Sequence, residues 1–149
     1  MKKHRKSVDE EELENHLRSL KLIKLPDGRF GVMGDVDFSF LELTSLLELP
    51  IRIRIVSGNF WCSFNNLTSL EGAPERVDGD FVCSFNNLTS LESAPKYVGK
   101  DFSCSCNKLI TLKGAPKDVK GNFYCNDNSK CFTEEKVRKL VNVKGKVIV

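Results

Sequence analysis

Histidine is almost absent from this sequence: only two of the 149 residues are His, both within the first 16. A Ser or Cys nucleophile in the remainder of the chain therefore has no imidazole base nearby in the sequence. Neither a glycine-rich phosphate loop nor the paired C-x2-C spacing of a zinc site is present. These absences favour a non-enzymatic protein and predict neither a cofactor nor a metal site.

Long apolar runs are also missing, and no segment approaches the length that spans a membrane. The basic residues 1–6 lead into the acidic run 9–12 and not into the apolar stretch of a signal peptide. We therefore expect a cytoplasmic protein with reduced thiols and no membrane contact.

Charge is weak in total, at +3, but unevenly distributed. Residues 58–99 have two Lys or Arg against five Asp or Glu, a net of −3, whereas residues 100–149 have eleven against five, a net of +6. This asymmetry is ordinary solvated charge, or it steers a partner. It leaves a nucleic-acid contact as an alternative function, through Lys100, Lys108, Lys113, Lys117, Lys120, Lys130, Lys136, Arg138 and Lys139.

What the sequence does have is a strict repeat in residues 58–125. Gly58-Asn-Phe-Trp-Cys-Ser-Phe-Asn-Asn-Leu-Thr-Ser-Leu returns 21 residues later, returns again with changes, and begins a fourth time. The residues that stay in register are Phe60, Phe81, Phe102 and Phe123, Cys62, Cys83, Cys104 and Cys125, and Asn65, Asn86, Asn107 and Asn128. A fixed period of about 20 to 50 residues predicts a solenoid.

Each copy has the pattern of a strand followed by a returning segment. Phe60 and Cys62 are two apart and share one face of a strand, whereas Leu67 and Leu70 are three apart. One copy buries too few side chains to offset the entropy of ordering 21 residues, so only a stack of copies is stable. We therefore expect the four in-register cysteines to line the interior as small hydrophobic groups.

The pattern Phe-x-Cys-x-x-Asn-x-Leu-x-x-Leu resembles the leucine-rich repeat, most closely its short bacterial type. This resemblance implies an α/β solenoid of short parallel strands, with the Asn side chains inside, where they satisfy backbone groups. The Leu-x-Gly-Ala-Pro rhythm and the Phe132-Thr-Glu-Glu ending are similar to short repeat proteins of bacteriophage genomes. That likeness implies a host enzyme or defence factor as partner, which the chain would inhibit or redirect.

The ends of the chain read as caps on a single domain. Residues 1–6 form a basic tail, 7–33 a helix and a strand-turn-strand cap, 34–128 the repeats, and 129–149 a helix-strand cap. The first helix is predicted from about Val8 to Leu20, with Ser7 as its N-cap. Thr133 is predicted to cap the last helix, and Val147 and Val149 to point inward from a final strand. An added outer strand is expected within residues 51–56.

Function is expected on the concave side of the strands, where this family commonly binds partners. Residues between Phe and Cys point outward, which places the only Trp on that face. The predicted partner-binding residues are Trp61, Val82, Tyr124, Ser63, Ser84, Asp80, Asp101, Phe64 and Phe85; whether Phe40, Phe64 and Phe85 are packed or exposed stays open. We expect a monomer or a weak homodimer, and a self-associating structural subunit is a further alternative.

Overall fold

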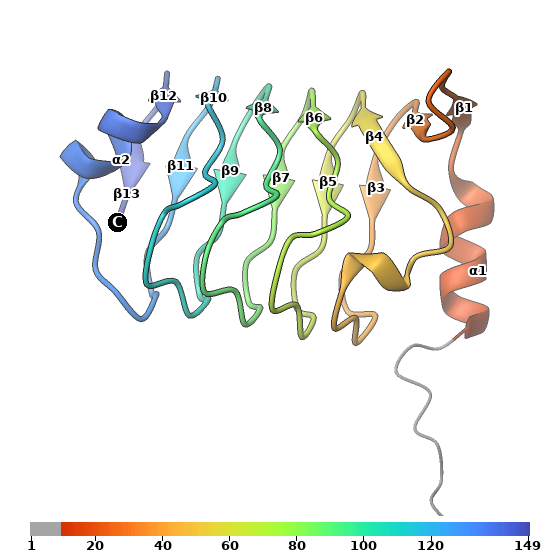
Figure 1. Ribbon diagram of the computed structural model, residues 1–149, viewed down its shortest axis with the longest axis horizontal. Helices are drawn as coiled ribbons and strands as arrows, with labels where there is room; N and C mark the ends of the chain where they lie inside the picture. Colours follow the sequence, from red (N-terminus) through yellow and green to blue (C-terminus); the bar gives the residue numbers. More distant parts are fainter. Residues whose placement is uncertain (1–9) are drawn as a thin grey trace, which may run out of the picture.

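The computed structural model describes residues 10–149 and shows a solenoid with a helix near each end (Figure 1). Helix α1 (Glu10–Ser19) stands at one end, and α2 (Glu134–Leu140) lies at the other. The predicted start of the first helix at Val8, its Ser7 cap and the basic tail lie outside the described residues. Between the two ends the coils repeat with the predicted period, so the solenoid prediction is confirmed.

One sheet contains the strands that the repeats predict. It has six parallel strands in the order β13-β11-β9-β7-β5-β3. Their bounds are β3 Val36–Asp37, β5 Phe60–Trp61, β7 Phe81–Val82, β9 Phe102–Ser103, β11 Phe123–Tyr124 and β13 Val147–Ile148. Phe60 pairs with Phe81 and Phe81 with Phe102, a step of 21 residues, whereas the steps from Val36 to Phe60 and from Phe123 to Val147 are 24.

A second sheet, which the sequence patterns did not predict as such, lies nearer the viewer in Figure 1. It has seven strands in the order β1-β2-β4-β6-β8-β10-β12, all parallel except the β1–β2 hairpin. Their bounds are β1 Leu22–Lys24, β2 Phe30–Val32, β4 Ile53–Val56, β6 Arg76–Val77, β8 Tyr97–Val98, β10 Asp118–Val119 and β12 Asn142–Val143. The added strand expected within residues 51–56 is therefore β4, one member of a continuous sheet.

The core fills the space between the two sheets. Phe60, Phe81, Phe102 and Phe123 are buried and stack with ring centroids 5.1–5.6 Å apart. Cys62, Cys83, Cys104 and Cys125 are buried and unoxidised beside them, as predicted. Val56, Val77, Val98 and Val119 face them from the seven-stranded sheet. Each coil thus contributes one Phe, one Cys and one Val to three continuous interior columns.

A buried amide joins each coil to the one before it. Asn65 Oδ1 accepts from the backbone N–H groups of Leu41 and Leu43, and its Nδ2 donates to the carbonyls of Phe38 and Cys62. Asn86, Asn107 and Asn128 make the corresponding bonds in later coils. The interior position of the Asn column is confirmed, and the amide supplies both the donor and the acceptor that a buried turn needs.

Both ends of the stack are covered by apolar side chains. Leu13, Leu17 and Leu20 of the α1 region pack against the core. At the other end Thr133 caps α2 by accepting from the Lys136 N–H, and Phe132 and Val137 are buried. Val147 is partly buried, but Val149 is 49% exposed, so its predicted inward orientation is wrong. No further coil among residues 10–149 packs over it.

Replacing Asn65 with Ala should lower the free energy of unfolding by about 2–4 kcal/mol, because buried donors and acceptors in two coils lose their partners. Urea denaturation measures this loss. Asn66→Ala is the matched control: Asn66 is exposed, and its replacement should cost less than about 0.5 kcal/mol. Equal losses for the two variants would contradict the assigned role of the buried amide.

Stability should fall as the pH rises above about 9, because burial raises the pKa of Cys62, Cys83 and Cys104, and raises that of Cys125 to about 11. Unfolded thiols ionise near pH 8.5, at about their ordinary pKa, so alkaline unfolding releases protons and each thiol contributes at most about 1.4 kcal/mol per pH unit. Urea denaturation of Cys83→Ala between about pH 8 and 11 should show a shallower decline than the parent. An unchanged slope would contradict a buried neutral thiol.

Candidate protein-binding face

The outward surface of the six-stranded sheet, here called the six-stranded face, carries the predicted aromatic row. Asp37, Trp61, Val82, Ser103, Tyr124 and Ile148 are paired in register across the six strands. Trp61, Val82 and Tyr124 are each partly exposed. The structure therefore brings these three predicted residues onto one row, about 4.8 Å apart from coil to coil along the backbone.

The acidic residues predicted for this face have a structural task as well. Asp80 Oδ1 accepts from the backbone N–H of Asp101, and Asp101 Oδ1 accepts in turn from the N–H of Asn122. Asp35 and Asn59 do the same one coil earlier. These side chains replace a missing backbone acceptor at the start of each strand, a role that their spacing of 21 residues could have indicated.

Glycines before these strands make room for that bond. A Cβ on Gly79 would overlap Asn59 Oδ1 and the Gly58 carbonyl. Gly58 and Gly121 stand in the same relation to Asp35 and Asp101. The recurring glycine is therefore required by a close approach between coils and not by a ligand.

The serines predicted as contacts are covered. Ser63 is 7% and Ser84 6% exposed, which corrects the expectation that this row lies open on the surface. Their hydroxyls bond to the next coil: Ser63 Oγ donates to the Val82 carbonyl, and Ser84 Oγ lies 2.7 Å from Ser103 Oγ. Their role in partner binding stays a prediction, and they offer little surface for it.

Phe40, Phe64 and Phe85, here called the Phe row, answer the question that the sequence left open. They are 66%, 45% and 48% exposed, yet they stack on one another with centroids 4.5 and 4.4 Å apart and planes within 9°. The row is packed within itself and open to solvent. Sequence analysis did not choose Phe40 as a site residue, although its shift of 24 from Phe64 matches the shift between the first two coils.

The backbone of this row is left-handed. Phe40, Phe64, Phe85, Cys106 and Asp127 have φ between 54° and 61°. This conformation is uncommon for residues other than Gly, Asn and Asp and is unfavourable for bulky ones. Asp127 is a comfortable occupant, so the turn itself does not require a ring. Three consecutive phenylalanines here place exposed apolar surface where a polar residue would serve the fold better.

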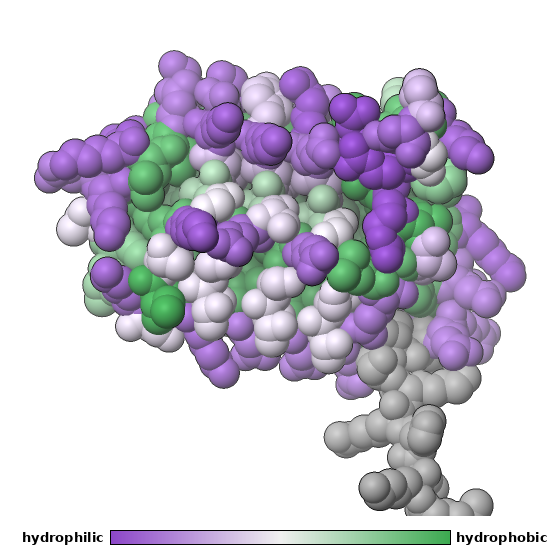
Figure 2. Space-filling view, in the orientation of Figure 1, coloured by the Kyte–Doolittle hydropathy of each residue, from purple (hydrophilic) through white to green (hydrophobic). Residues whose placement is uncertain are grey.

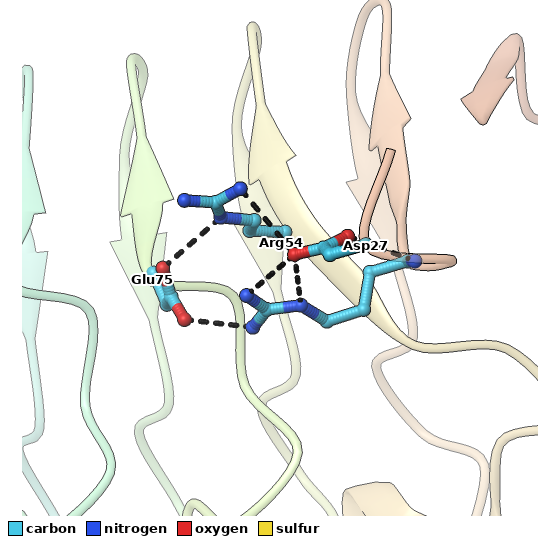
Figure 3. Close-up of polar contacts among 4 residues, drawn as sticks. Asp27, Arg54 and Glu75 are labelled. Atoms are coloured by element: carbon cyan, nitrogen blue, oxygen red, sulfur yellow. Dashed lines mark hydrogen bonds and ion pairs between the residues drawn. The ribbon is translucent and has the colours of Figure 1, made fainter. Parts of the chain in front are cut away.

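The densest charged cluster lies on the opposite sheet and is internally neutralised. Arg29 contacts Asp27 at 2.8 Å and Glu75 at 2.7 Å, and Arg54 contacts the same two carboxylates (Figure 3). Hydrogen bonds from Arg29 lower the pKa of both carboxyl groups. Strongly hydrophilic side chains gather over β2 and β4 in this region (Figure 2). The network fastens the β1–β2 hairpin to the first coils.

A shallow cavity of about 280 Å³ adjoins this network and includes Arg29, Arg52 and Glu75 in its lining. Its guanidinium groups are engaged within the protein. Arg29 binds two carboxylates, and Arg52 donates to the carbonyls of Leu47, Leu49 and Ile51. These contacts give the cavity arginines a role in holding the fold.

Within residues 10–149, no group of three or more His, Cys, Asp or Glu side chains is arranged to hold a metal ion. None of the helices in this part of the chain has the length and apolar character needed to cross a membrane.

Comparisons with protein-family models, curated proteins and solved structures give no match for this chain. The class is set by the geometry alone: parallel strands stacked at a period of 21 residues, with an inward Asn column, form a solenoid of the leucine-rich-repeat type.

Replacing Phe64 with Asn should change the free energy of unfolding by less than about 1 kcal/mol, because relief of the left-handed backbone offsets the lost ring stacking. Phe81→Ala, one coil away in the core, should cost about 3–5 kcal/mol. Urea denaturation compares the two variants. A Phe64→Asn loss as large as that of Phe81→Ala would show that the Phe row serves the core and not the surface.

Proposed function

We propose that this chain is a non-enzymatic protein-binding module that docks a partner on its six-stranded face. The observation that carries the proposal is the Phe row, three stacked rings between 45% and 66% exposed on strained backbone. Trp61 lies three residues before Phe64, roughly 10 Å along the strand direction. Aromatic anchors with a polar rim are the usual composition of an interface centre.

The finer identity of the partner comes from the sequence pattern. Similarity to short repeat proteins of bacteriophage genomes supports a bacterial host protein, either an enzyme or a defence factor, which the chain inhibits or redirects in the host cytoplasm. A rigid solenoid suits this role, since little ordering entropy is lost when a preformed face binds. The chain itself acts as a monomer or a weak homodimer.

The alternative of nucleic-acid contact has less support. Three of its predicted cations are engaged within the chain: Lys113 pairs with Glu92, Lys139 with Glu135, and Arg138 with Glu134. Arg138 also donates to the carbonyls of Val143 and Gly145. Since phosphate binding depends on uncompensated cations gathered on one face, these internal pairs favour the protein partner.

Replacing Trp61 with Ala should weaken partner binding by about 2 kcal/mol or more, roughly thirtyfold in Kd, because a buried aromatic anchor is lost. The partner is captured from bacterial lysate with the intact chain as bait, and the purified pair is then measured by calorimetry. Lys117→Ala is the control, since Lys117 is exposed beside the other sheet. Undiminished affinity of the Trp61→Ala variant would refute the proposed interface.

A further inference from the structure

The Phe row stops at Cys106 although the backbone continues unchanged. Cys106 has φ 54°, against 55° at Phe64 and 56° at Phe85, so its side chain leaves the coil at the same position in the turn. A thiol is much shorter than a benzyl group. One face of the Phe85 ring stacks on Phe64, and its other face lies toward the Cys106 coil, where no ring continues the stack.

The resulting gap, here called the Cys106 slot, is the size of one aromatic ring. Its far side is formed by the coil of Asp127, two coil spacings from Phe85, or roughly 9.6 Å. A ring stacked on Phe85 at the 4.4 Å spacing of the existing pair would lie level with Cys106, midway across the slot. The partly exposed Cys106 thiol forms the floor, and Ile110, 61% exposed, lies four residues further along the same turn.

The charges around the slot narrow the choice of occupant. Lys108 and Lys130 are both exposed, and the bond from the Lys130 N–H to the Leu109 carbonyl sets them beside each other. Asp127 is the one nearby carboxylate, and its Oδ2 accepts from Asn126 Nδ2. Two cations against one anion disfavour a guanidinium in the slot and favour an aromatic side chain with acidic neighbours.

We propose that the Cys106 slot receives an aromatic side chain from an acidic segment of the partner protein, completing the Phe row from outside. The inference rests on the proposed function and adds what the partner presents. Parallel stacking on Phe85 supplies the ring specificity, and Lys108 and Lys130 supply the preference for acidic flanks.

Disulfide tethering at Cys106 tests the slot without the partner. The intact chain with Cys131→Ser is equilibrated with equal amounts of two small disulfides, one carrying a 2-phenylethyl group and the other a 2-cyclohexylethyl group. Cys62, Cys83, Cys104 and Cys125 are buried and stay unmodified. Mass spectrometry should show the phenyl adduct favoured about two- to tenfold, the preference expected for one stacked pair.

Phe85→Leu is the matched variant, because it keeps an apolar side chain and removes the ring face. It should bring the two adducts to parity. Equal retention of both groups by the parent, or a preference that survives Phe85→Leu, overturns the slot.

Filling the slot separates this inference from the proposed function. Cys106→Phe should extend the Phe row and weaken capture of the partner at least tenfold, with folding checked by circular dichroism. If Trp61→Ala abolishes capture while Cys106→Phe leaves it intact, the six-stranded face binds the partner and the slot does not. A phenyl preference that holds while Trp61→Ala binds normally places the failure in the proposed interface.

Discussion

The structure depends on the amide that each coil offers to the one before it. A coil of 21 residues turns sharply after every strand and leaves backbone groups in the interior, where water cannot reach them. Asn65, Asn86 and Asn107, all nearly buried, satisfy those groups on both sides of the turn. Because one amide joins two coils, loss at one position loosens the contact between neighbours, and the stack is stable only as a whole.

The same turn produces the exposed rings. The residue before each Asn is left-handed, which directs the amide inward and the preceding side chain outward. A strand alone would alternate, and Phe64 would follow Ser63 onto the opposite face. The left-handed residue breaks that alternation, so the fold's most buried polar group and its most exposed aromatic group are neighbours in the chain. The candidate site is therefore a direct product of the constraint that holds the solenoid together.

Sequence reasoning reached the interior well because identity at a fixed spacing marks it. Phe60, Cys62 and Asn65 recur without a slip, and each fits only one place in a stacked coil. The second sheet was harder to predict, since strands such as β6 contribute a single apolar residue, Val77, to the core. Burial of Ser63 and exposure of Phe64 depend on a backbone angle that residue type does not reveal, because Phe is a poor occupant of the left-handed region.

The uniform register between neighbouring coils has an evolutionary consequence. Residues 63–71 and 84–92 are identical in sequence, and both segments fit the same structural environment. Unequal recombination between the two gene segments would insert or delete one whole turn, with both terminal caps and every interior column left continuous. The length of the aromatic surface can therefore change in single-turn steps without a new fold, which gives such a gene a short route to lengthening or shortening its recognition surface.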